Sequence, residues 1–115
     1  MTVNELISGI NAVVLAGVPD GREVRYGYTC DLLSHVMSHG VAGMAWVTVQ
    51  THMNVVAVAS LLEFACVLIP ESLPVEAPIL DKAATEGIVM LSSALTAYEI
   101  IKYLADNGVE PAKKA

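Results

Sequence analysis

Two histidines four positions apart are the first residues that could do chemistry. His35 and His39 lie on one predicted helix, and Asp31 precedes them by one turn on the same flank. Histidines at this spacing can bind one metal ion. The HxxxH pattern lacks the intervening glutamate of a metalloprotease, and the sequence shows no evident third ligand nearby. We therefore favour a polar helix flank facing solvent, with a metal site as the alternative.

A third histidine and a cysteine are further candidates. His52 follows a predicted buried strand, where it could donate a hydrogen bond to an anion or titrate near neutral pH. A packing or turn role is the competing interpretation. Cys30 is expected in the first turn of a helix, which would stabilise its thiolate, although a small buried residue is the commoner explanation. Cys66 lies within an apolar strand and is expected in the core, and both thiols are expected to be reduced.

Polar side chains follow several of the predicted strands. In open α/β sheets, ligands bind beyond the carboxyl ends of the strands, and helix N-termini there favour phosphate or carboxylate groups. The predicted ligand-binding residues are Tyr28, Thr29, Thr51, His52, Asn54, Ser92, Ser93 and Thr96. For any one of these residues, a role as a helix cap or turn former is the competing interpretation.

Short elements alternate along the chain and must position these residues. Apolar and β-branched runs predict strands at 12–16, 24–28, 44–51, 65–69 and 88–91. Helical spacing, capping residues and Pro or Gly predict helices at 4–10, 30–39, 54–64, 78–87 and 94–105. Thr29 and Asn54 are the predicted caps of the second and third helices. In the last helix, the residues expected to face inward are Leu95, Tyr98, Ile101 and Tyr103 or Leu104. The alternation predicts one α/β domain over residues 1–115, with a small parallel sheet, helices on both faces and a frayed tail at 109–115.

Charge is scarce in the middle of the chain. Between Tyr26 and Pro70 only Asp31 and Glu63 are charged, as expected for parallel strands that helices cover on both faces. The net charge of -6 argues against a protein that binds a nucleic-acid backbone. Because 55% of the residues are hydrophobic, we expect part of the apolar surface to be covered in a homodimer or higher homo-oligomer.

The sequence also bears on membranes and compartment. The most apolar run, Val55 to Pro70, is shorter than a bilayer span, and Glu63 interrupts it. The first ten residues lack the basic start and small-residue cleavage site of a secretory signal. We therefore expect a cytoplasmic protein with no membrane association.

Familiar catalytic motifs are missing from the sequence. It contains no GxxxxGK[ST], GxGxxG or GxSxG segment and no set of kinase signatures. Phosphoryl transfer needs groups that clamp both phosphates and metal, and carboxylates are scarce around the predicted site. We expect no catalysis and no cofactor, with an adenine nucleotide as a possible ligand.

Four segments carry a resemblance to a known family. GYTCDLLSHVM, MAWVTVQTHMNVVAVASL, ACVLIPES and DKAATEGIVMLSSALTAYEIIKYL resemble the DRTGG-domain family, over about residues 24–105. This is the fold of the N-terminal domain of HPr serine kinase/phosphorylase. The resemblance implies an α/β regulatory domain that is often dimeric and that in some members helps to bind adenine dinucleotides. Where the family's name motif falls, this chain has Thr51-His52-Met53-Asn54.

The sequence leaves three functions open. The first is a non-catalytic regulatory or sensor domain that binds a small anionic ligand at the strand ends. The second is a homo-oligomeric protein-interaction subunit without a small ligand. The third is a small metal- or thiol-dependent protein that uses Cys30, His35, His39 or His52.

Overall fold

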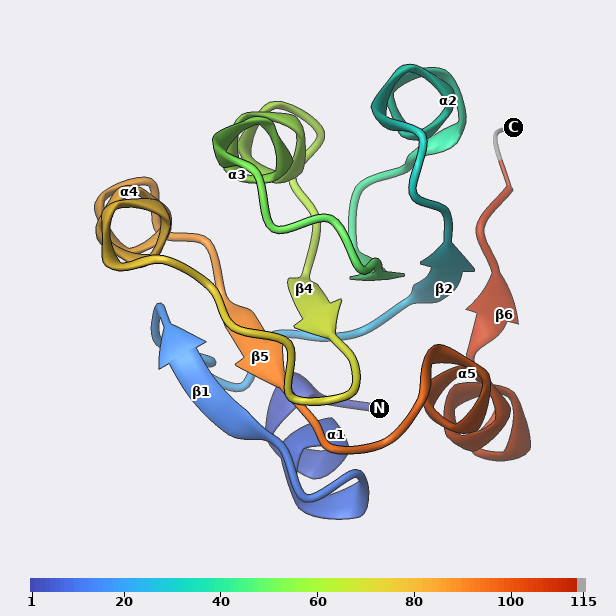
Figure 1. Cartoon of the computed structure of the whole chain (residues 1–115). Helices are drawn as coiled ribbons and strands as arrows, with labels where there is room; N and C mark the ends of the chain where they lie inside the picture. The colour runs from blue at the N-terminus through green and yellow to red at the C-terminus, as the bar shows by residue number, and fades with distance from the viewer. Residues whose placement is uncertain (114–115) are drawn as a thin grey trace.

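The computed structural model of the chain describes residues 1–113, which form one six-stranded sheet in the order β1-β5-β4-β3-β2-β6 (Figure 1). The strands are β1 (Val13–Ala16), β2 (Tyr26–Thr29), β3 (Met44–Val47), β4 (Cys66–Ile69), β5 (Met90–Ser92) and β6 (Glu110–Pro111). The helices are α1 (Val3–Gly9), α2 (Leu33–His39), α3 (Met53–Leu61), α4 (Ala77–Thr85) and α5 (Ala97–Asp106). The predicted α/β fold with helices on both faces of the sheet is confirmed.

The direction of the first strand differs from the prediction of a parallel sheet. Strands β2 to β5 are parallel, but β1 pairs antiparallel with β5 at the edge of the sheet. An apolar run indicates that a strand is buried, and it contains no information on the direction of its partner. Antiparallel edge strands are common on otherwise parallel sheets. As a consequence, the first residue of β1 lies beside the carboxyl end of β5, where the parallel strands end.

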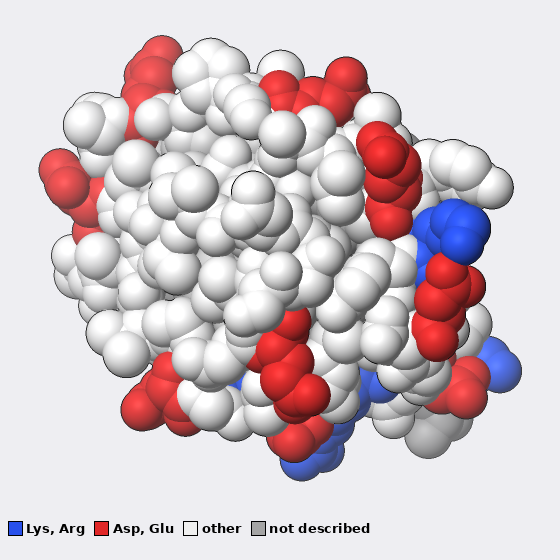
Figure 2. Space-filling view, turned by 90° about the horizontal axis from the view of Figure 1, so that it is seen from below, with Lys and Arg blue, Asp and Glu red and all other residues white. Residues whose placement is uncertain are grey.

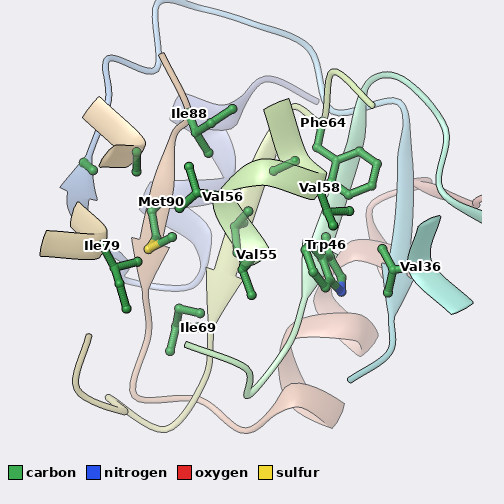
Figure 3. Packing of buried hydrophobic residues seen from close by; sticks show 14 of the residues in the cluster. Val36, Trp46, Val55, Val56, Val58, Phe64, Ile69, Ile79, Ile88 and Met90 are labelled. Carbon is green, nitrogen blue, oxygen red and sulfur yellow. The ribbon is translucent and has the colours of Figure 1, made fainter. Parts of the chain in front are cut away.

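The uncharged middle of the chain forms the two central strands. Every residue of β3 and β4 is buried, because helices pack on both faces. Helices α2, α3 and α4 cover one face and α1 and α5 the other (Figure 1). On the first face Trp46 packs among Val36, Val55, Val58, Phe64 and Ile69 (Figure 3). In β3 and β4 the absence of charge therefore reflects burial, as the sequence predicted.

The helix starts differ in two places from the predicted caps. Thr29 ends β2 rather than capping α2, whose cap is Leu32 without a side-chain hydrogen bond. Asn54 lies inside α3, and His52 is the cap. β3 ends at Val47 instead of continuing to Thr51. After β3, the Thr48 hydroxyl and the Val49 N–H bond to Asp31 instead of continuing the strand, and this contact with a distant segment is not encoded in the local sequence.

The end of the described chain pairs with β2, in a segment where the sequence predicts a frayed tail at 109–115. Glu110–Pro111 pair parallel with the start of β2, and the N–H of Ala112 donates to the carbonyl of Gly27 at 3.0 Å. Residues 114–115 of the predicted tail lie outside the described residues. Tyr98, predicted to face inward, is 77% exposed on α5.

The face that carries α1 and α5 has an uneven distribution of charge. Its middle is uncharged, and acidic and basic side chains lie around its rim (Figure 2).

Among the described residues, no helix is both long enough and apolar enough to cross a bilayer.

Candidate functional site

The turn between β3 and α3 is held by the carboxylate of Asp31, an exposed residue that follows β2. Asp31 accepts hydrogen bonds at Oδ1 from the Thr48 hydroxyl at 2.8 Å and from the Val49 N–H at 3.0 Å. The amide side chain of Gln50 donates to the Asp31 carbonyl at 3.1 Å, and the Gln50 N–H donates to Thr48 Oγ1. Three of these bonds tie the turn to Asp31, in the segment that follows β2, and the fourth lies within the turn. The backbone after β3 is thereby fixed before α3 begins.

The N-terminus of α3 has one satisfied and several free donors. Nδ1 of His52 accepts from the Asn54 N–H at 3.1 Å, so neutral His52 carries its proton on Nε2, away from this bond. Within residues 1–113, the N–H groups of Thr51, His52 and Met53 donate to no acceptor. Free N–H groups at a helix start, together with the helix dipole, favour an anion.

A cleft of about 720 Å³ opens in front of this helix start. It is lined by Val49, Gln50, Thr51, His52, Pro74, Glu76 and Ile79, from the β3–α3 turn and the start of α4. Glu76 is the cap residue of α4 and makes no side-chain capping bond, and the Ala77 N–H has no acceptor among the described residues. The N-termini of α3 and α4 thus flank the same cleft.

Two predicted site residues lie at the end of β2, apart from this cleft. The Tyr28 side chain packs with the α2–α4 layer, and burial, followed by the neighbouring Cys30 thiol, raises the pKa of its phenol. Thr29 is exposed and lines a different hollow of about 300 Å³ against α5. The structure therefore does not bring Tyr28 and Thr29 together with Thr51 and His52.

The predicted residues after β5 are engaged in internal bonds. Ser93 is buried, donates to the Ile10 carbonyl at 2.9 Å and accepts from the Leu95 N–H at 3.2 Å. Thr96 caps α5 and forms a capping box with Glu99. Ser92 is half-buried at the end of β5. The structure gives Ser93 and Thr96 the cap and turn roles that the sequence left open beside a binding role.

The tight turn at Glu71 and Ser72, which follows β4, lies against the segment after β5. In the turn, the Glu71 N–H donates to the Leu95 carbonyl and the Ser72 N–H to the Ser93 carbonyl, both at 2.9 Å. Glu71 and Ser72 have φ values of 58° and 50°, which non-glycine residues rarely adopt. These bonds separate the β5 end from the cleft beside α3.

The histidine pair is placed together but not as a metal site. The rings of His35 and His39 stack with centroids 4.0 Å apart, and His39 Nδ1 lies 3.0 Å from the His35 carbonyl oxygen. In the described residues, no three His, Cys, Asp or Glu side chains are grouped so as to hold a metal ion.

Asn54, whose N–H bonds to His52, lines a separate groove between α2 and α3.

The cysteines occupy different environments. Cys30 lies before α2 rather than in its first turn, and its thiol is directed to the Leu32 carbonyl, 3.8 Å away. Cys66 is fully buried in β4, and burial raises the pKa of its thiol to about 12. The predicted core position of Cys66 is confirmed.

Sequence reasoning missed two contributors to the cleft. The sequence analysis does not place Asp31 at this site, although its position as one of two charged residues between Tyr26 and Pro70 is a signal for a specific contact. Glu76 gave no signal, because an acidic residue before a helix is common. Both positions depend on how the loops meet at the sheet edge.

Comparison with known proteins gives one informative likeness. No family model matches the sequence, and no curated protein matches it. In three dimensions, the chain is similar to the CBS and DRTGG domains of the regulatory region of Clostridium perfringens pyrophosphatase, solved with the activator diadenosine tetraphosphate. The TM-score is 0.72 at 8% sequence identity, over 98% of this chain and 50% of that chain. This chain therefore spans half of that region, and the likeness shows the fold, of CBS/DRTGG type.

Proposed function

We propose that the chain is a non-catalytic regulatory domain that binds a small anionic ligand in the cleft between the β3–α3 turn and α4. The proposed ligand is an adenine nucleotide. The observation that carries the proposal is the arrangement of two helix N-termini, those of α3 and α4, around one cleft of about 720 Å³. Phosphate groups are the ligands that such paired helix starts favour.

The other lining residues suit the remaining parts of a nucleotide. Val49, Pro74 and Ile79 provide apolar contacts for a base, and Val49 is 44% exposed. The Glu76 carboxylate accepts hydrogen bonds from ribose hydroxyls, and Gln50 is held by its bond to the Asp31 carbonyl. The likeness to a regulatory region that binds diadenosine tetraphosphate supports the same ligand class. A DRTGG-family membership and a cytoplasmic location are part of this proposal.

Replacing Met53 with proline tests the proposal at its backbone donors. Met53 is the first residue of α3, where proline is well tolerated, and the substitution deletes one free N–H group without touching the side chains of the cleft. We expect Met53→Pro to weaken binding of ADP or diadenosine tetraphosphate by about tenfold or more, as measured by titration calorimetry.

The matched control is Ala97→Pro, which makes the same change at the first residue of α5, away from the cleft. It is expected to bind like the unmodified chain, and both variants are expected to melt within a few degrees of it. Equal affinities for the Met53→Pro variant and the unmodified chain, or no binding of any adenine nucleotide, would contradict the proposal.

A second candidate function, a self-associating interaction subunit, is favoured by the outer surface of α2 and α3. No Lys, Arg, Asp or Glu occurs in either helix, yet Leu32, Met37, Met53 and Leu61 are 36–67% exposed there. An apolar groove of about 300 Å³ lies between the two helices. For a chain of net charge -6, two copies repel least through a surface without charge. The occupant we propose for this surface is a second copy of the chain.

Replacing Leu61 with aspartate tests this association. Leu61 lies on the groove and is 67% exposed, so the change places a charge in the contact without disturbing the core. Light scattering is expected to give a dimer for the unmodified chain and a monomer for Leu61→Asp. The control is Tyr98→Asp, which changes a residue of α5 that is 77% exposed; this variant should stay dimeric. A monomeric unmodified chain, or a dimeric Leu61→Asp variant, would refute the association through this face.

A further inference from the structure

Another cavity lies at the amino ends of the parallel strands, on the side of the sheet opposite to the cleft between α3 and α4. It has a volume of about 490 Å³ and is lined by residues that precede β2, β3, β4 and β5, at positions 22, 23, 25, 42, 43, 60, 63–65 and 86–88. It is therefore separate from the cleft at the carboxyl ends of the strands. Its walls come from four connections that are far apart in the sequence.

Both arginines of the chain line this cavity. Arg22 and Arg25 are the two arginines in the sequence, and within residues 1–113 no carboxylate lies within 4.0 Å of either guanidinium. A guanidinium presents a planar fork of donors that matches carboxylate and phosphate groups. Two such forks on one cavity form a recognisable site for an oxyanion.

The acidic side chains around the cavity are mostly engaged elsewhere. Glu23 lies 3.5 Å from the Met1 ammonium, and Glu86 pairs with Lys82 at 2.9 Å. The hydrogen bond and charge of Lys82 lower the pKa of the Glu86 carboxyl, so this pair stays ionised and internally neutral. Of the carboxylates lining the cavity, only Glu63 has no ion-pair partner within residues 1–113. Two guanidinium groups against one such carboxylate leave a local excess of positive charge.

The backbone holds Arg25 over the cavity. Its N–H donates to the Gly43 carbonyl at 2.9 Å, and its side-chain stem crosses Gly43 so closely that a Cβ there would be 3.0 Å from Arg25 Cδ. Gly43 also has a φ of 79°, which glycine adopts without strain. A residue without a side chain thus allows the arginine to lie across the turn.

The remaining lining adds an apolar floor and one acceptor. Phe64 and Ile88 are buried beside the cavity, so a ligand with an apolar body is accommodated as well as its anionic group. Glu63 lies two residues after α3 with a φ of 58°, in the left-handed region where glycine is usual, and its carbonyl accepts from the Gly43 N–H at 3.0 Å. Its carboxylate is placed to accept a hydrogen bond from the ligand.

We propose that this cavity is a second anion site, which binds a small organic molecule bearing a phosphate or carboxylate group through Arg22 and Arg25. The site lies on the opposite edge of the sheet from the nucleotide cleft and does not depend on it. Two ligands bound at opposite edges of one sheet would allow the domain to respond to two signals.

Titration calorimetry with inorganic phosphate, ribose 5-phosphate and succinate tests the site and separates phosphate from carboxylate recognition. We expect saturable binding of at least one probe to the unmodified chain, weakened roughly tenfold or more in Arg22→Met and Arg25→Met, which keep the apolar stem and lose the charged fork. Lys102→Met is the control: it removes the same charge from the exposed surface of α5, where Lys102 pairs with Asp106. Its affinity should be unchanged.

The outcomes that would overturn the site are distinct from those that test the nucleotide cleft. No saturable binding of any probe at ~10 mM would refute it, as would equal affinities of both arginine variants and the unmodified chain. An equal loss of probe affinity in Met53→Pro would place the anion at the other edge instead. Melting curves without probe show whether the variants are folded, and Arg25→Lys, which keeps the charge but not the fork, should bind with intermediate affinity.

Discussion

Replacing Trp46 with alanine is expected to lower the free energy of unfolding by about 3–5 kcal/mol. Trp46 is fully buried in β3, packs edge-on against Phe64 with ring centroids 5.7 Å apart, and donates from Nε1 to the Cys30 carbonyl at 2.9 Å (Figure 3). The substitution removes the largest side chain of the core and leaves that carbonyl without its donor. For a domain whose total stability is about 5–15 kcal/mol, this is a large fraction.

Urea denaturation followed by circular dichroism measures the effect. Trp46→Phe should cost less, because it keeps an aromatic ring and loses the hydrogen bond to Cys30. Tyr98→Ala is the control on the exposed surface of α5 and should change stability by less than about 0.5 kcal/mol. A loss below about 1.5 kcal/mol in Trp46→Ala would mean that this face of the sheet is not packed as described.

Replacing Asp31 with alanine is expected to cost about 1–3 kcal/mol and to loosen the β3–α3 turn. The Thr48 hydroxyl and the Val49 N–H both lose their acceptor, Oδ1 of Asp31, and the Thr48 side chain is buried. Because the free N–H groups of Thr51, His52 and Met53 follow directly, ligand affinity in the cleft should fall together with stability.

Amide hydrogen exchange separates the two effects. Exchange at Val49 and Gln50 should become faster in Asp31→Ala, while exchange at β4 changes only as much as global stability does. Glu71→Ala is the control, since it removes the same charge from an exposed position at the same edge of the sheet. Unchanged exchange at Val49 would show that Asp31 does not hold the turn.

The burial of the two central strands could be predicted from the sequence, because each is a continuous apolar run in a segment with little charge. The segment from Tyr26 to Pro70 has only two charged residues, and it contains the two strands that are buried on both faces. Apolar runs with turn residues between them therefore locate β3 and β4. Strand direction and the partner of Glu110–Pro111 depend on distant segments, which is why the antiparallel β1 and the pairing of β6 were not predicted.

The candidate site was predicted in part. The rule that ligands bind beyond the ends of parallel strands selected Thr51 and His52, and both line the cleft. The same rule selected Ser93 and Thr96, whose hydroxyls the structure uses for internal bonds. A sequence shows which polar residues follow a strand, and it does not show which loop folds over them. The arginine cavity lies at the other edge of the sheet, which this rule does not address.

An NMR titration of the ¹⁵N-labelled chain with diadenosine tetraphosphate tests directly whether a nucleotide binds in the cleft. We expect the largest amide shifts at Thr51, His52 and Met53 and at Ala77, whose free N–H groups flank the cleft. Shifts confined to residues 22–25 and 42–43 would place the nucleotide in the arginine cavity instead. The absence of any shift would contradict a nucleotide-binding function for this domain.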